Sequence, residues 1–168
     1  MSKVTFVKCA AKDNPALSIK KGDSYYWWKH RFGPKQVSKT PPTPAMTTSS
    51  EFLRSAYNLN DELAAFVCST VEDAETQTQD LSDRARELAE ECQEKFDNMP
   101  EGLQQGSTGE LLQERVDGMN ELADALENLD LDISEKEESE TLEAFNERFA
   151  ERIEEINSEV TALSYEGS

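Results

Sequence analysis

The most regular pattern in the sequence is a series of apolar and small residues between Val71 and Cys92, which follow one another in alternating steps of three and four. Such steps keep these residues on one stripe of an α-helix, and three repeats are typical of helices that pack lengthwise against another helix. We therefore predict one unbroken helix over residues 71–97, stopped by Pro100 and Gly102. The stripe includes four residues that we expect to contact a second copy of the chain, namely Leu81, Ala85, Leu88 and Cys92.

The same periodicity predicts three further helices. Their apolar residues lie within residues 52–66, 112–133 and 142–163, and the polar stretch at residues 58–61 could break the first of them. Each of the four helices is preceded by a serine or threonine three residues before a glutamate, a pattern that satisfies free N–H groups at helix starts. The four matches are Thr48 with Glu51, Ser69 with Glu72, Ser107 with Glu110 and Ser134 with Glu137.

The first 45 residues have a different pattern, with short alternating runs separated by turn signals. A weak strand is predicted around residues 4–8, and an aromatic strand over residues 24–32. The Gly33-Pro34 pair predicts a hairpin connection to a partner strand over residues 36–40, which the following prolines end. Alternation gives the aromatic strand two faces. We expect Tyr26, Trp28, His30 and Phe32 on the packed face, and Tyr25, Trp27, Lys29 and Arg31 on the other.

These patterns predict a mainly α-helical protein with a small N-terminal β module. We place a basic aromatic β-hairpin module at residues 1–45 and an acidic α-helical bundle at residues 46–168. Short connections favour antiparallel neighbours in the bundle. Alanine, threonine and cysteine occupy much of the helical stripe, where leucine would fill a core better. We therefore expect the bundle to be completed by self-association through the helix at residues 71–97 or the helix at residues 142–163.

Charge divides the chain in the same way. Residues 1–50 carry nine bases and two acids, a net charge of +7, whereas residues 51–168 carry eight bases and 33 acids, a net charge of −25. Opposite charge on two parts of one chain indicates different partners for each part. The acidic part has two interpretations: solvated helical faces, or mimicry of DNA that lets it occupy a nucleic-acid-binding cleft.

The second face of the aromatic strand suggests a binding surface, because rings can stack on bases while lysine and arginine contact phosphates. The predicted contact residues are Tyr25, Trp27, Lys29, Arg31, Lys35 and Lys39. Contact with a protein, or a purely structural role for the rings, explains the same pattern, and the sequence leaves these alternatives open.

Residues 20–44, KKGDSYYWWKHRFGPKQVSKTPPTP, resemble a segment found in uncharacterised proteins of tailed bacteriophages. The resemblance covers the first third of the chain. It implies a phage origin and a location in the host cytoplasm, and no activity or functional residue comes with it.

Catalytic motifs are lacking: the sequence has no P-loop, no nucleophile elbow and no zinc-protease signature. We expect no cofactor and no metal, since His30 is the single histidine and only Cys9 accompanies it in the module. Three cysteines without close spacing suggest a reducing cytoplasm. Residues 1–10 do not resemble a signal peptide, and no apolar stretch approaches the length of a membrane span.

Together these observations predict a non-enzymatic phage protein whose β module binds nucleic acid and whose helices mediate assembly into a homo-oligomer. An inhibitor or adaptor that binds a host protein through the acidic helices is the first alternative. A virion or assembly component is the second.

Overall fold

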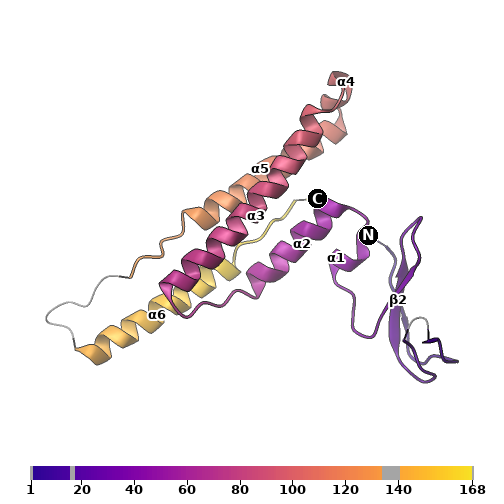
Figure 1. Cartoon of the computed structure of the whole chain (residues 1–168), viewed down its shortest axis with the longest axis horizontal. Coiled ribbons are helices and arrows are strands. Elements are labelled where there is room, and N and C mark those ends of the chain that lie inside the picture. The colour runs from indigo at the N-terminus through magenta and orange to yellow at the C-terminus, as the bar shows by residue number, and fades with distance from the viewer. Residues whose placement is uncertain (1, 16–17, 134–140, 168) are drawn as a thin grey trace. The chain divides into compact units, whose positions relative to one another are not determined.

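Helices make up most of the chain, and three short strands near the N-terminus form an antiparallel sheet, so the predicted fold class is confirmed (Figure 1). The structure is a computed structural model and describes residues 2–15, 18–133 and 141–167. The chain divides into two units, Met1–Tyr57 and Asn58–Ser168. This division lies inside a helix, whereas the sequence places the boundary after residue 45. The net charges of the two units remain +7 and −25.

The sheet is built around its aromatic strand. Strand β2 (Tyr25–Lys29) lies between β1 (Thr5–Val7) and β3 (Lys35–Ser38), and both neighbours are antiparallel to it. Trp27 is directly opposite Thr5 on one side and Val37 on the other. Opposite residues of antiparallel strands share a face, so this register fixes which side chains gather on each side of the sheet.

The aromatic strand is shorter than the sequence predicts. Strand β2 ends at Lys29, and the chain turns at once, with the N–H of Gly33 donating to the carbonyl of His30 at 3.2 Å. His30, Arg31 and Phe32 therefore lie outside the strand, and strand alternation does not assign their side chains to the two faces of the sheet. Phe32 was expected on the packed face, but its side chain is 91% exposed. The turn required by Gly33-Pro34 begins earlier than the aromatic pattern indicates.

Two helices follow the sheet. Helix α1 (Pro44–Thr47) is a single turn, and α2 (Glu51–Ala64) is continuous, so the polar residues 58–61 do not break it. The predicted cap of α2 was Thr48, but the oxygen that accepts from the helix is Ser50 Oγ, which receives the N–H of Leu53 at 3.3 Å. Thr48 Oγ1 instead accepts from the N–H of Ser50.

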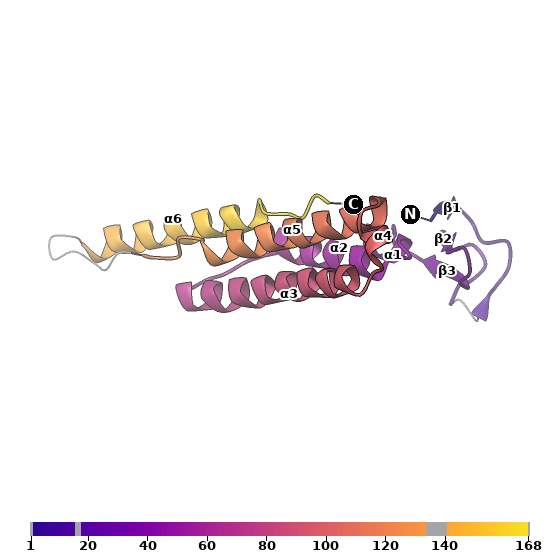
Figure 2. The same cartoon turned by 90° about the horizontal axis from the view of Figure 1, so that it is seen from above.

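Helix α3 (Val71–Asp97) is unbroken over the whole predicted range. It leads through the short helix α4 (Glu101–Gln104) into α5 (Ser107–Glu127), and α3 and α5 pack antiparallel along their length (Figures 1 and 2). The buried side chains of α3 are mostly small, and those of α5 are mostly large. On α3 they are Ala74, Thr78, Leu81, Ser82, Ala85, Ala89 and Cys92, and on α5 they include Leu112, Val116, Met119, Leu122 and Leu126.

This match of small and large residues explains the thin stripe on α3. Small side chains let the two helices approach closely, and the large side chains of α5 fill the space between them. A single chain therefore buries most of the thin stripe.

The predicted helix caps are displaced by one residue or more. At α3 the cap is Thr70 rather than Ser69, and at α5 it is Gly106, which has no side chain to offer, with Ser107 already inside the helix. Helix α6 (Leu142–Thr161) is capped by Thr141, and the predicted Ser134 cap lies outside the described residues. Neighbouring hydroxyl residues compete for each cap, and spacing alone does not choose between them.

Two asparagine amides fasten the C-terminal part of the chain. Asn157 on α6 accepts from the N–H of Cys68 at 2.8 Å and donates to the carbonyl of the same residue at 3.2 Å. Asn60 on α2 holds Tyr165 in the same way, at 2.8 and 2.9 Å. Each amide satisfies both backbone groups of a residue in an irregular segment, where such groups otherwise lack partners.

Candidate functional site

The side of the sheet that carries Trp27 combines rings and cations. The register places Tyr25, Trp27 and Lys29 of β2 on one side, together with Lys35 of β3. We call these four residues the aromatic–basic face. Both rings are half-buried and both lysines are exposed. Four of the six predicted contact residues therefore do gather on one surface.

Lys35 lies over the rings of this face. Its Nζ is 4.3 Å from the centroid of the Trp27 ring and 5.9 Å from that of Tyr25. An ammonium group at this distance is attracted by the negative face of the ring. The cation is thereby held above the aromatic surface that a stacking ligand would use.

Lys29 and Lys35 are directly opposite each other at the end of the hairpin. Two like charges directly opposite each other in a cross-strand pair repel and destabilise a sheet. An anion bound between them would remove this repulsion. This pairing was not predicted, since it depends on the register of the two strands.

The other two predicted contact residues stand apart from the face. Arg31 lies in the turn after β2, with its guanidinium 5.2 Å from the ring centroid of Phe32. Lys39 forms an ion pair with Asp23 at 2.9 Å. The pKa of Asp23 lies below its ordinary value because its carboxylate accepts from the N–H of Lys20 and from Lys39. The charge of Lys39 is thus partly neutralised within the unit.

A small cavity borders the aromatic–basic face at Tyr25. Its volume is about 250 Å³, and Ile19 and Val37 contribute apolar walls. Ser18, which lines the same cavity, has a positive φ of 54°, a left-handed conformation that serine seldom adopts. The remaining lining residues are Ser38 and Lys39.

The opposite side of the sheet carries Trp28, Tyr26 and Phe6. Trp28 is 2% exposed, in agreement with its predicted packed position, and its Nε1 has no hydrogen-bond partner among the described residues. The rings of Tyr26 and Phe6 lie 4.8 Å apart between centroids. His30 Nδ1 is 2.8 Å from Ser2 Oγ, so the single histidine contributes to local packing.

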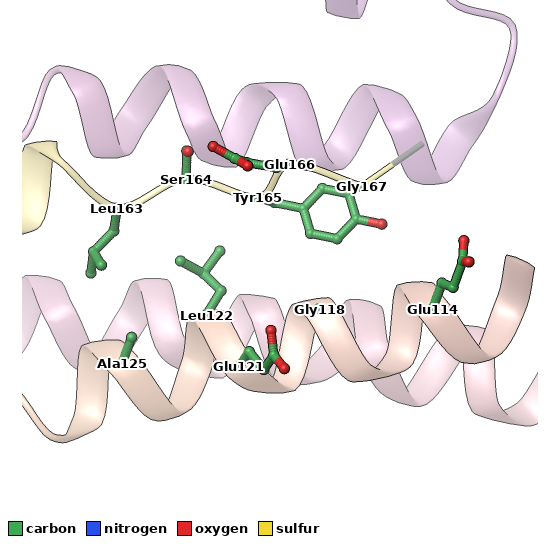
Figure 3. Close-up of a pocket in the computed structure, with 10 residues that line it drawn as sticks. All are labelled: Glu114, Gly118, Glu121, Leu122, Ala125, Leu163, Ser164, Tyr165, Glu166 and Gly167. Atoms are coloured by element: carbon green, nitrogen blue, oxygen red, sulfur yellow. The ribbon is translucent and has the colours of Figure 1, made fainter.

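A second candidate site lies on the helical unit, between α5 and the segment that follows α6 (Figure 3). This groove has a volume of about 360 Å³. Glu114, Glu121 and Glu166 supply carboxylates, and we refer to it as the acidic groove. Its other lining residues are Gly118, Leu122, Ala125, Leu163, Ser164, Tyr165 and Gly167. The sequence offered only Gly118 as a signal, because an interior helix glycine marks a close approach.

Three of the four residues predicted to form an intermolecular seam lie within the core of the helical unit. Ala85 and Cys92 are fully buried and Leu81 is 7% exposed, while Leu88 is half-buried. Burial raises the pKa of the Cys92 thiol, and likewise that of Cys68, which favours the unreactive protonated form of both. A single chain accounts for the burial of three of these four side chains, and self-association through the stripe stays a prediction.

Among residues 2–15, 18–133 and 141–167, no cluster of three or more potential ligands could hold a metal ion. Within the same ranges, no helix has the combination of length and hydropathy that a bilayer crossing demands. The sequence matches no family model, no curated protein and no solved structure. The resemblance to phage proteins therefore remains a prediction.

Proposed function

We propose that the N-terminal unit binds single-stranded nucleic acid through the aromatic–basic face, and that the acidic helices mediate assembly without catalysing a reaction. One observation carries the proposal. Trp27 and Tyr25 share a face with Lys29 and Lys35, and the two lysines form a like-charge pair directly beside the rings. A ligand with aromatic bases and phosphates complements both features at once.

The spacing of the rings favours a single strand over a duplex. Residues two apart in a strand are about 6.7 Å apart along its axis. Bases stacked in a duplex are separated by only about 3.4 Å. Two bases carried by an extended backbone can each reach one ring, whereas the bases of a duplex present only their edges to a protein.

Lys35 need not block stacking. An exposed cation–π contact contributes about 0.5–1 kcal/mol, whereas stacking of one base on an aromatic side chain contributes about 1–3 kcal/mol. A base can therefore displace the ammonium group from Trp27. The flexible lysine side chain then remains close enough to contact the phosphate of the same nucleotide.

Tryptophan fluorescence tests the proposal, because the two tryptophans differ in exposure. Trp27 is half-exposed on the aromatic–basic face and Trp28 is buried on the other side. In the full chain, Trp28→Phe leaves Trp27 as the reporter, and Trp27→Phe leaves Trp28 as the matched control. We expect a single-stranded oligonucleotide to quench the first variant and to leave the second unchanged. Absence of quenching in the first variant would reject the proposed binding face.

A further inference from the structure

The end of the β2–β3 hairpin is an unusual surface. Phe32 is 91% exposed, more than any other large apolar side chain in the described part of the chain. Arg31 lies against its ring, and Lys29 and Lys35 close the hairpin behind it. The turn therefore presents an exposed aromatic ring with one cation against it, next to the lysine pair at the end of the strands, and we call these four residues the hairpin tip.

The acidic groove has a charge opposite to that of the hairpin tip. Figure 3 shows Leu122 on α5 and Leu163 on the C-terminal segment pointing toward each other, with Glu114 beyond the Tyr165 ring. The groove thus has an apolar floor, and the three carboxylates of Glu114, Glu121 and Glu166 line it. An apolar floor with three carboxylates complements an exposed ring that lies next to Arg31, Lys29 and Lys35.

We propose that the hairpin tip of one copy docks in the acidic groove of a second copy. Phe32 would cover the apolar floor, and Arg31 would pair with Glu121. Glu121 lies seven positions after Glu114 on α5, which is about 10 Å along the helix axis.

Each copy has one tip and one groove. Two copies can therefore exchange tips reciprocally in a closed dimer, or successive copies can add to one another in a ring or an open chain. The proposed assembly role of the helices thereby acquires a specific surface, one that does not involve the buried stripe of α3. This inference does not depend on nucleic-acid binding.

Sedimentation velocity of the full chain over a concentration series provides the test. We expect the average mass to rise with concentration at low salt and to fall as salt screens the charges. Phe32→Ala should weaken the association about tenfold or more, since exposed aromatic anchors dominate interfaces. The matched control is Leu103→Ala, which shortens another exposed apolar side chain, 58% exposed, and should leave the mass unchanged.

A charge exchange separates this contact from general electrostatic attraction. Arg31→Glu and Glu121→Lys should each weaken the association about tenfold, and the chain that carries both should recover most of the loss. Quenching of Trp27 by an oligonucleotide should survive Glu121→Lys, which keeps the outcome separate from the proposed nucleic-acid binding. A wild-type chain that is monomeric at all concentrations, or a double variant as weak as either single one, would overturn the proposal.

Discussion

The ring of Tyr165 lies against the backbone of Gly118, so closely that a Cβ atom at Gly118 would come within 2.9 Å of Cε2 of the ring. Tyr165 is 8% exposed, and both of its backbone groups are bound by Asn60. The ring therefore has little freedom to move away. The segment after α6 is held by this contact together with the asparagine clamp.

We predict that Gly118→Ala destabilises the protein although alanine favours helices. The intrinsic preference for alanine amounts to about 1 kcal/mol, and overpacking costs about 1–3 kcal/mol. The net loss of unfolding free energy should be up to about 2 kcal/mol in urea denaturation. Gly102→Ala, where a Cβ meets nothing within 4 Å, is the control and should not destabilise. In a Tyr165→Ala background, Gly118→Ala should become stabilising, and persistence of the loss there would contradict the contact.

Leu81 tests whether the stripe of α3 is internal. Because its side chain is almost fully buried in one chain, we expect Leu81→Ala to lower the unfolding free energy by about 2–5 kcal/mol. Leu81→Glu together with Leu88→Glu should unfold the helical unit, as seen by circular dichroism. If that pair of substitutions instead yielded a folded, soluble monomer from an assembled wild type, the stripe would be intermolecular.

An ion pair between α3 and α5 gives a pH dependence. Glu127 accepts from Arg86 at 2.8 and 2.7 Å and from Ser82 at 2.8 Å, and these contacts lower its pKa from 4.5 to about 2. A lowered pKa in the folded state means that the contribution to stability is complete above about pH 4.5. It is lost as the pH falls toward 2.

Glu127→Gln should therefore destabilise the protein at pH 7, and the difference from the wild type should shrink between pH 4.5 and 2. Urea denaturation at several pH values measures this difference. Glu90→Gln, at an exposed position of α3, serves as the control and should show no such trend. A difference that stays constant down to pH 2 would contradict the role of the ion pair.

Local pattern was enough to predict much of the fold. The uninterrupted spacing of apolar residues predicted α3 correctly over residues 71–97, and the aromatic alternation predicted Trp28 as buried. Both are consequences of short-range periodicity, which the sequence displays directly. The end of β2 at Lys29 was not predicted, because the turn at Gly33-Pro34 outweighs the strand preference of the residues before it.

The local sequence pattern did not predict contacts between residues that are far apart in the chain. Asn60 binds Tyr165 across 105 positions, and Asn157 binds Cys68 across 89. Nothing in the residues near either asparagine indicates its partner. The like-charge pair of Lys29 and Lys35 was also not predicted from the sequence, because a shift of one residue in the strand register would have placed these lysines on opposite faces.

The central claim is that the aromatic–basic face binds single-stranded nucleic acid. Fluorescence anisotropy of a labelled oligonucleotide, titrated with the full chain across a salt series, tests it most directly. Each neutralised phosphate should contribute about 0.7 to the slope of log affinity against log salt concentration. Lys29→Ala with Lys35→Ala should lower this slope by about 1.4, whereas Lys8→Ala with Lys12→Ala, at exposed lysines outside the face, should leave it nearly unchanged.

Trp27→Ala separates stacking from charge in the same measurement. Loss of one stacked base should weaken binding about five- to 150-fold while the salt slope stays the same, because stacking releases no counterions. The account predicts binding at low salt with these two distinct responses. Absence of binding by the folded full chain at low salt, or binding that Trp27→Ala and the Lys29 and Lys35 substitutions leave unchanged, would contradict it.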